Sequence, residues 1–458
     1  MTTIISGATI VNEGRRYIGS VLIDNDKIIR IHQGKDFQRD PVISAAAALS
    51  NTEIVDGVGA YLLPGIIDDH VHFRDPGMTH KADMHTESMA AAAGGVTSVL
   101  DMPNVNPQTT TVQRWQERMQ MAAGKMHVNY GFYLGATNSN IDEILAMDDT
   151  RYPGVKLFMG SSTGGMLVEK REALEAIFRQ SRKLIMVHAE DTSIINRNMA
   201  EYQQKYGEDP DVKYHPEIRS AEACYASSSL AVQLADKYNA RLHIAHISTA
   251  RELELLEPFK IIKNQSVTPL ITGEVCVSHL LYNDKDYERL GTKIKCNPSI
   301  KHNVDRQALR QALNDGLIYT IGTDHAPHLL EEKQGGAKKA VSGMPMVQFS
   351  LASMLELKDQ GILSIERLVQ LMSHNPAQLF AIQNRGYIRE GYQADVVLVK
   401  RTDGYTVDRN QILSKCGWSP REGDTLHWQI LTTWVNGHKV WNGTNINENV
   451  YGEALRFV

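Results

Sequence analysis

The sequence has few of the features that mark secreted or membrane-spanning proteins. Its four cysteines are scattered and form no Cys-x-x-Cys pair, which predicts reduced thiols and a cytoplasmic protein rather than a disulfide framework. No apolar run approaches the roughly 20 residues that cross a bilayer. The first residues also lack a basic region followed by a long apolar stretch. We therefore expect neither a membrane segment nor a secretory signal.

The chain also lacks an excess of either charge. Its 458 residues include 48 lysines and arginines against 53 aspartates and glutamates, a net charge of −5. A protein that binds nucleic acid or an acidic membrane is expected to present a strongly basic surface. We expect neither of these partners. We expect a small-molecule substrate and a homo-oligomer, with a dimer favoured.

Short β-rich stretches occupy both ends of the chain. They lie at 9–11, 20–23, 27–31, 394–399 and 434–441. The last stretch contains Asn436-Gly437, a dipeptide typical of a tight β-hairpin. Two β-rich ends that flank a long middle predict one small β-sandwich domain formed by residues 1–60 and 386–458 together.

The middle of the chain, residues 61–385, alternates apolar strands with helical stretches. The expected strands are 66–72, 96–102, 128–134, 154–159, 184–188, 241–246, 266–272 and 317–323. Helices fit between them, for example the Ala-rich stretch 88–93, which Gly94 stops. This alternation predicts an α/β protein with a (β/α)8 barrel of the TIM type. A doubly wound open sheet is the alternative, but no Gly-rich nucleotide-binding turn follows the first strand.

Polar side chains recur where these strands end. They are His70 and His72 on the first strand, Asn104 after the second, Lys156 in the fourth, His188 and His246 closing the fifth and sixth, and Asp324 after the eighth. Barrel active sites lie at the C-terminal ends of the strands, so these groups would meet at one rim. One such histidine is commonly structural. Four of them with an aspartate indicate a metal centre, because imidazole and carboxylate suit Zn²⁺ and its neighbours.

Lys156 lies inside an apolar strand, where a free ammonium is costly to bury. One interpretation is a lysine that reaches out to water at the strand end. The other is that CO₂ carboxylates its amine, which turns a cation into an anionic ligand with two oxygens that can bridge two metals. With this carbamate, the four histidines and the aspartate would hold two zinc ions and a bridging hydroxide.

Several motifs together resemble the dihydroorotase family of the amidohydrolase superfamily. They lie at 64–77, 101–104, 323–328 and 384–399. The resemblance covers essentially the whole chain and implies a metal-dependent barrel that interconverts L-dihydroorotate and N-carbamoyl-L-aspartate in pyrimidine biosynthesis. It implies that His70, His72 and Asp324 bind one metal, that His188 and His246 bind the other, and that Lys156 bridges them. Some members use a bridging aspartate, whereas the 154–160 strand resembles the carbamylated-lysine type.

The resemblance also assigns roles in catalysis and substrate binding. Asp324 is expected to act as general base and then general acid. The substrate-binding residues it implies are Arg74, Asn104, Asn297, His328 and Gly343. Arg74 offers a planar fork for the ring carboxylate of dihydroorotate. Allantoinases and hydantoinases share the metal ligands but lack this arginine, and a non-catalytic scaffold relative would have lost ligands, none of which is missing.

Two further stretches have open interpretations. Residues 325–345 contain a polar, glycine-bearing run that is either a lid over the site or a solvated surface loop. Lys81, Asp83 and His85 are expected to cap and solvate the helix that follows the first strand.

Overall fold

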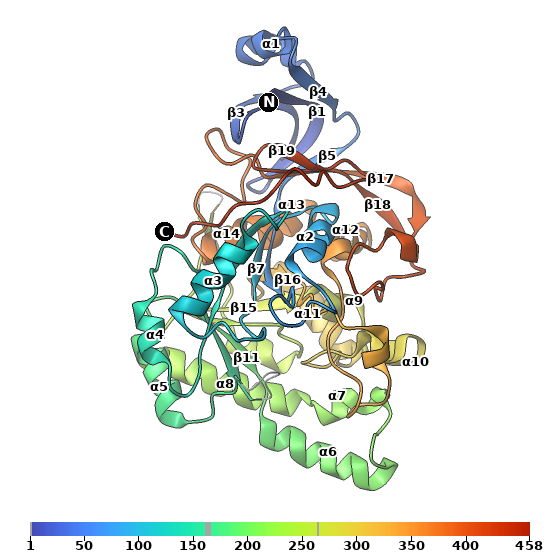
Figure 1. The fold of residues 1–458 in the computed structure, drawn as a ribbon. Helices are drawn as coiled ribbons and strands as arrows, with labels where there is room; N and C mark the ends of the chain where they lie inside the picture. Colours follow the sequence, from blue (N-terminus) through green and yellow to red (C-terminus); the bar gives the residue numbers. More distant parts are fainter. Residues whose placement is uncertain (1, 161–165, 263–264) are drawn as a thin grey trace.

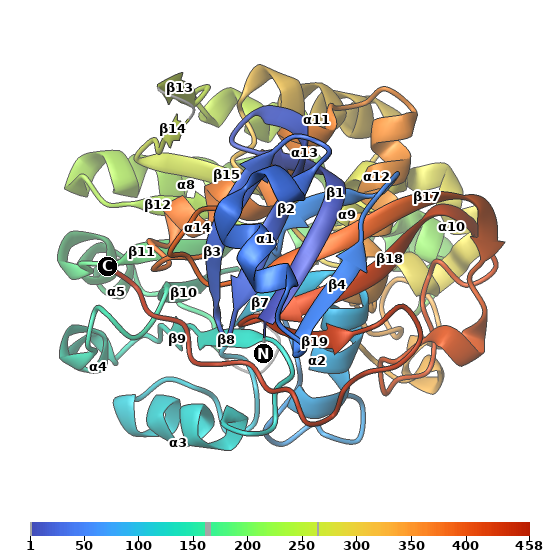
Figure 2. The same ribbon diagram turned by 90° about the horizontal axis from the view of Figure 1, so that it is seen from above.

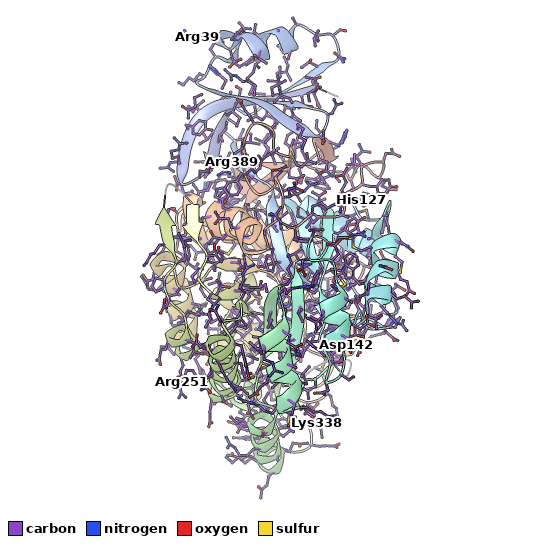
Figure 3. The ribbon with its side chains drawn as sticks, turned by 90° about the vertical axis from the view of Figure 1, so that its left-hand side faces the viewer. Arg39, His127, Asp142, Arg251, Lys338 and Arg389 are labelled. Atoms are coloured by element: carbon purple, nitrogen blue, oxygen red, sulfur yellow. The ribbon has the colours of Figure 1, made fainter. Side chains whose placement is uncertain are left out.

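A parallel barrel and a sheet built from both ends of the chain make up the molecule (Figure 1). The computed structural model describes residues 2–160, 166–262 and 265–458. Figure 3 shows the two parts from the side, with Arg39 at the outer end of the terminal part and Lys338 near the opposite end of the molecule.

The terminal strands form one hydrogen-bonded sheet, in the order β19-β18-β17-β5-β1-β2-β3 with β4 beside β1. Their bounds are β1 Thr2–Asn12, β2 Arg15–Asp24, β3 Lys27–Gln33, β4 Thr52–Asp56, β5 Tyr61–Pro64, β17 Val396–Thr406, β18 Thr425–Val435 and β19 His438–Trp441. Strand β5 joins the two ends, because it pairs with both β1 and β17. The prediction that strands from both termini come together is confirmed, because they are joined in one continuous sheet.

The predicted hairpin is also present. Val435 pairs with His438 across Asn436 and Gly437, whose φ angles are 50° and 75°. A two-residue hairpin turn of the primed type needs positive φ at both positions, which Asn and Gly tolerate best.

The barrel strands pair in parallel around a closed ring. Their bounds are β6 Ile66–Val71, β7 Val96–Asp101, β8 Asn129–Phe132, β9 Leu134–Gly135, β10 Gly154–Met159, β11 Leu184–Ala189, β12 Leu242–Ile244, β15 Ile271–Cys276 and β16 Thr320–Gly322. Strands β8 and β9 are two pieces of the predicted third strand. A parallel bridge between Val71 and His325 joins the last strand to the first. The predicted barrel is confirmed.

Helices surround the barrel (Figure 2). The α-helices are α1 Pro41–Ala47, α2 Met84–Ala93, α3 Val112–Ala122, α4 Ile141–Ala146, α5 Arg171–Gln180, α6 Thr192–Tyr206, α7 His215–Ile218, α8 Ala221–Tyr238, α9 Val277–Leu281, α10 Tyr287–Leu290, α11 Asn303–Asp315, α12 Ser350–Asp359, α13 Ile365–Val369 and α14 Asn375–Leu379. In α5 the buried residues Leu174, Ile177 and Phe178 recur at helical spacing, so one face packs on the barrel.

The seventh barrel strand was placed wrongly from the sequence. We expected it at 266–272, but β15 begins at Ile271 and ends at Cys276. Part of the expected stretch instead forms β14, Gln265–Val267, which pairs with β13, Lys260–Ile262, in a small antiparallel hairpin. Both stretches contain residues that favour strands, and composition alone does not show which one joins the barrel. The shift matters because β15 brings Glu274 into the barrel.

Candidate active site

One pocket of about 820 Å³ brings together every site residue that the sequence predicted. Its lining includes His70, His72, Arg74, Asn104, Lys156, His188, His246, Asn297, Asp324, His328 and Gly343. These residues come from seven barrel strands or the segments that follow them, as expected for the active-site face of such a barrel.

The first group of predicted metal ligands is already assembled around Asp324. Its Oδ1 lies 3.0 Å from Nε2 of His72 and 3.4 Å from Nε2 of His70. Burial lowers the pKa of both imidazoles to about 3, so both rings are neutral at pH 7, which is the form that binds metals. Burial alone would raise the pKa of Asp324, but His70 and His72 outweigh it and hold this carboxyl below its usual range. These three residues can hold a metal ion.

The second group lies on β11 and just beyond β12. His188 Nδ1 and His246 Nε2 are 2.9 Å apart, so two nitrogens from different strands point at the same place. Nδ1 of His246 is buried and finds no hydrogen-bond partner among the described residues. Glu190 lies 3.1 Å from Nε2 of His188 and is itself held by Arg219 through two nitrogens. The outer side of His188 is therefore fixed by a buried ion pair.

Lys156 is buried on β10, with 1% of its surface exposed. Its Nζ has no hydrogen-bond partner within the described ranges and lies 5.4 Å from the ring centre of Phe158. Burial lowers the pKa of this amine to about 8, against the opposing charges of Glu274 and Asp324. The interpretation of a lysine that reaches out to water is wrong. A buried amine without a hydrogen-bond partner is rare in a folded protein, so its presence in the pocket needs an explanation.

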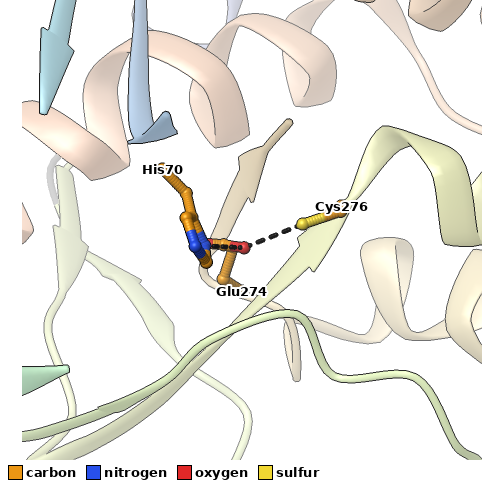
Figure 4. A group of neighbouring side chains, drawn as sticks. All are labelled: His70, Glu274 and Cys276. Carbon is orange, nitrogen blue, oxygen red and sulfur yellow. Dashed lines mark hydrogen bonds and ion pairs between the residues drawn. The ribbon is translucent and has the colours of Figure 1, made fainter. Parts of the chain in front are cut away.

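Glu274 is the site residue that the sequence prediction missed. Its two carboxylate oxygens lie 3.1 and 3.2 Å from Nδ1 of His70, and one of them also accepts from the thiol of Cys276 at 3.0 Å (Figure 4). The backbone N–H of His246 donates to the same oxygen. Burial raises the pKa of Glu274 to about 7. A partner of this kind fixes the tautomer and direction of a metal-binding histidine, here turning Nε2 of His70 toward Asp324.

Three of the site residues have positive φ without being glycine. They are Arg74 at 63°, His246 at 39° and Asp324 at 47°. An L-residue in this region costs on the order of 1–3 kcal/mol, which the surrounding packing must offset. Strained positions of this type concentrate at functional sites, and here they set the directions of side chains just past the ends of strands.

The opposite wall of the pocket is built around Arg74. Its Nε donates to the carbonyl of Pro327 at 3.1 Å, and its Nη2 lies 3.0 Å from Nε2 of His328. Asn104 contacts a predicted metal ligand, because its Oδ1 accepts from Nδ1 of His72 at 2.9 Å. The buried guanidinium and the predicted metal ligands therefore line one pocket.

Asn297 and Gly343, the remaining substrate-binding residues that the resemblance implied, both line the pocket. Oδ1 of Asn297 lies 3.2 Å from Nε2 of His215. The N–H of Gly343 donates to the carbonyl of Lys295, and its carbonyl oxygen accepts from Nζ of Lys333, so both backbone groups are already engaged. Its φ is 132°, and an added Cβ would lie 2.9 Å from the ring of His328. Glycine is needed at 343 for this close approach.

The segment 325–345 combines buried anchoring groups with exposed residues such as Glu331, Gln334 and Lys338. Lys333, on the 3-10 turn Leu330–Lys333, is buried and donates to the carbonyls of Lys295, Val341 and Gly343 at 3.0, 2.8 and 2.7 Å. Farther along, Asp209 accepts from the backbone N–H groups of 336, 338 and 339. Ala326, His328, Ser342 and Gly343 of this segment line the pocket, and its role as a lid stays a prediction.

The helix-capping interpretation holds for Asp83 but is wrong for Lys81. Asp83 is the N-cap of α2 and accepts from the backbone N–H of Thr86 at 2.9 Å. Lys81 instead lines the pocket beside His328. His85 contacts His127, at 3.2 Å between ring nitrogens. Sequence spacing gives no sign of this, because the direction of Lys81 depends on how the turn after β6 folds back.

No helix in the described part of the chain combines the length and the apolar character that crossing a membrane requires.

Comparisons with known proteins agree with this geometry. The Amidohydrolase family model matches residues 61–440. A dihydroorotase of Methanosarcina acetivorans is 33% identical over 93% of this chain and 89% of its own length, and one of Lactobacillus gasseri is 30% identical over 96% and 99%. Among solved structures, the L-hydantoinase (dihydropyrimidinase) of Arthrobacter aurescens superimposes with a TM-score of 0.88 and 26% identity over 97% of both chains. A dihydropyrimidinase of Brevibacillus agri, at 24% identity and a TM-score of 0.85, shares the fold. The resemblance that the motifs indicated is confirmed, and the chain belongs to the amidohydrolase family.

Proposed function

We propose that this cyclic amide hydrolase is a dihydroorotase, which interconverts L-dihydroorotate and N-carbamoyl-L-aspartate in pyrimidine biosynthesis. The observation that carries the proposal is the buried Arg74, which lines the same pocket as the predicted metal ligands. Dihydroorotate has a ring carboxylate at one end and the amide bond that breaks at the other. A pocket with a guanidinium at one end and metal ligands at the other matches both ends of this substrate.

Two zinc ions are the metals proposed. His70, His72 and Asp324 would hold one, and His188 and His246 the other. The donor atoms fit this role, because they already converge and the imidazoles of His70 and His72 are neutral. When bound, such a pair of metals supplies a hydroxide nucleophile near neutral pH and polarises the carbonyl of the ring.

Lys156 is proposed to carry the bridging group. Its neutral amine would attack CO₂, forming the N–C bond of a carbamate and releasing one proton. Burial supports this step, because it lowers the pKa of the amine to about 8 and so raises the neutral fraction. The product is an anion that would balance part of the charge of two dications.

Asp324 is proposed to move the proton of the reaction. Its carboxylate is ionised, since the two histidines hold its pKa below its usual range, and it lines the pocket. In ring opening, Asp324 would take the proton of the attacking water and deliver it to the ring nitrogen as the C–N bond breaks. In ring closure the proton would travel the opposite way.

Substrate orientation is proposed to come from the wall opposite the metals. Arg74 would bind the ring carboxylate through two N–H groups, with Asn104 and His328 beside it and Asn297 near the ring. Hydantoin and allantoin lack this carboxylate. With them, a buried guanidinium would lose its water without gaining an anion, which disfavours these alternative substrates.

Steady-state rates on four substrates test the proposal. Protein with a known zinc content is assayed with L-dihydroorotate, dihydrouracil, hydantoin and allantoin. We expect kcat/KM for dihydroorotate to exceed the others by about 100-fold or more, the discrimination that an unpaired buried charge produces. Activity on the last three alone would contradict the proposal. Protein that binds no zinc would favour the non-catalytic scaffold.

A matched variant makes the zinc measurement specific. His302 is an exposed histidine outside the pocket, paired with Asp284 and Glu217. The His302→Asn variant should keep two zinc ions per chain, whereas His188→Asn should lose one of them.

The domain division and the dimer are proposals as well. Residues 1–60 and 386–458 would form the β domain and 61–385 the catalytic barrel. Light scattering of the purified protein tests the dimer, with a mass near 51.1 kDa as the contradicting result.

A further inference from the structure

Lys81 extends the cationic wall of the pocket beyond the residues assigned so far. It lies in the turn between β6 and α2, and its side chain is only 12% exposed. Its Nζ is 3.2 Å from Nδ1 of His328 and forms an ion pair with Glu332. Lys81 thus reaches the same imidazole as Arg74, from the other side.

The imidazole of His328 cannot accept hydrogen bonds from both Arg74 and Lys81. Arg74 lies 3.0 Å from Nε2 of the ring and Lys81 lies 3.2 Å from Nδ1, and both cations can only donate hydrogen bonds. A neutral imidazole has one acceptor nitrogen and one N–H, whereas an imidazolium has two N–H groups and no acceptor nitrogen. In either form at least one ring N–H faces a cationic donor.

An anion would relieve this arrangement. A carboxylate has two oxygens and about four acceptor sites, so one that enters the pocket can accept from a ring N–H of His328 and from the cation beside that nitrogen. Glu332, the carboxylate nearest to Lys81, lies 3.7 Å from Nδ1 of His328, too far for a hydrogen bond to the ring. The wall therefore lacks an acceptor for at least one of these donors.

We propose that Lys81 determines specificity by binding the carboxylate of the substrate together with Arg74 and His328. This inference rests on the proposed function and deepens it, because it names a second cation for the carboxylate end of the substrate. Lys81 does not reach the reacting amide, so its contribution is to binding: it acts equally on substrate and transition state and should appear in KM rather than in kcat.

Four variants test the proposal in the zinc-loaded enzyme. Lys81→Met removes the charge but keeps the length, and Lys81→Arg keeps the charge. Glu332→Gln removes the ion pair between Glu332 and Lys81 but keeps the Lys81 side chain. Lys439→Met is the matched control, because Lys439 pairs with Glu53 in the terminal sheet, away from the pocket. KM and kcat for dihydroorotate are measured, together with calorimetric binding of orotate and of uracil, the same ring with and without a carboxylate.

Lys81→Met is expected to raise KM and to weaken orotate binding by about 10- to 100-fold, the loss of one hydrogen bond between charged groups. Its kcat, zinc content and weak uracil binding should stay within about twofold of the wild-type values, the scatter expected for a change outside the reacting atoms. Lys81→Arg should retain most of the affinity, and Glu332→Gln and Lys439→Met should leave KM unchanged.

Three results would overturn the role of Lys81. They are an unchanged KM in Lys81→Met, equal weakening of orotate and uracil, and a Glu332→Gln variant that reproduces the loss, which would mean that Lys81 only fastens the wall. A wild-type enzyme that does not open dihydroorotate would instead contradict the proposed function. The orotate and uracil comparison would still decide on Lys81.

Discussion

The two ends of the pocket are built in different ways. At the metal-binding end the side chains stand on strands or within two residues of their ends, and buried partners such as Glu274 hold their rings. At the proposed carboxylate-binding end, Arg74, Lys81 and His328 lie on connecting segments. Arg74 and Lys81, which follow β6, both contact His328, which follows β16. The strands of a barrel are its most constrained part, whereas its connections vary. In the proposed account, the barrel strands position the metal ligands and the connecting segments select the substrate.

The largest effect expected is at the metal-binding end. Replacing Lys156 with Ala should abolish activity on every cyclic amide and remove at least one of the two zinc ions, because no anion would then bridge them. Metal analysis and rates on dihydroorotate measure both losses. Added acetate or propionate should restore part of the activity by supplying a carboxylate in the cavity. Wild-type zinc content in the variant would contradict the bridge.

The next largest effect should show that substrate binding and zinc binding can be lost separately. Arg74→Met should lower kcat/KM for dihydroorotate by about 100-fold or more, since a bidentate pair with a carboxylate is lost, and should leave zinc content unchanged. Arg401→Met is the control, because Arg401 pairs with Asp359 on the surface. An Arg74→Met enzyme that loses its zinc would show that the two ends are not separate.

Glu274→Gln should weaken zinc binding by about 10- to 100-fold and leave orotate binding in zinc-saturated enzyme intact, because Glu274 acts by orienting His70. Competition with a zinc chelator gives the affinity. Glu252→Gln is the matched control, another buried carboxylate of the barrel, bound to Ser228 and Thr249. Equal loss of zinc affinity in both variants would mean that Glu274 only stabilises the fold.

These expectations also show what the sequence could predict. The metal-binding end was predictable because its side chains lie in or just after strands that the sequence marks as apolar runs. His70 and His72 also share one face of such a strand. Glu274 was missed because its strand was placed too early, and a glutamate within an apolar run shows no sign of facing a histidine. Lys81 was misassigned for a different reason. Its partners Glu332 and His328 lie about 250 residues away in sequence, and no local pattern encodes how two connections meet.

A smaller effect on KM is expected from Lys333, which donates hydrogen bonds within the 325–345 segment. Lys333→Met removes a donor from the carbonyls of Lys295, Val341 and Gly343, of which Lys295 keeps the N–H of Gly343. The wall should shift and KM should rise by less than about tenfold, the loss of one or two ordinary hydrogen bonds. Lys338→Met, in the same segment but exposed, should behave as wild type. A fall in kcat with unchanged KM would contradict a role confined to binding.

The smallest effect should touch neither end. Asp83→Ala removes the N-cap of α2 and should lower the free energy of unfolding by about 1 kcal/mol, with KM and zinc affinity unchanged. Denaturant unfolding and steady-state rates measure the two quantities. A kinetic effect larger than that of Lys333→Met would mean that the helix, rather than the connections, positions the carboxylate end.

A crystal structure of the zinc-loaded protein with dihydroorotate, grown in bicarbonate, tests both ends at once. The account predicts two zinc ions about 3.5–4 Å apart, joined by density that continues beyond the Lys156 amine. It also predicts the substrate carboxylate within hydrogen-bond distance of Arg74 and Lys81. A bare Lys156 amine beside a single metal, or a substrate whose carboxylate points away from Arg74, would contradict it.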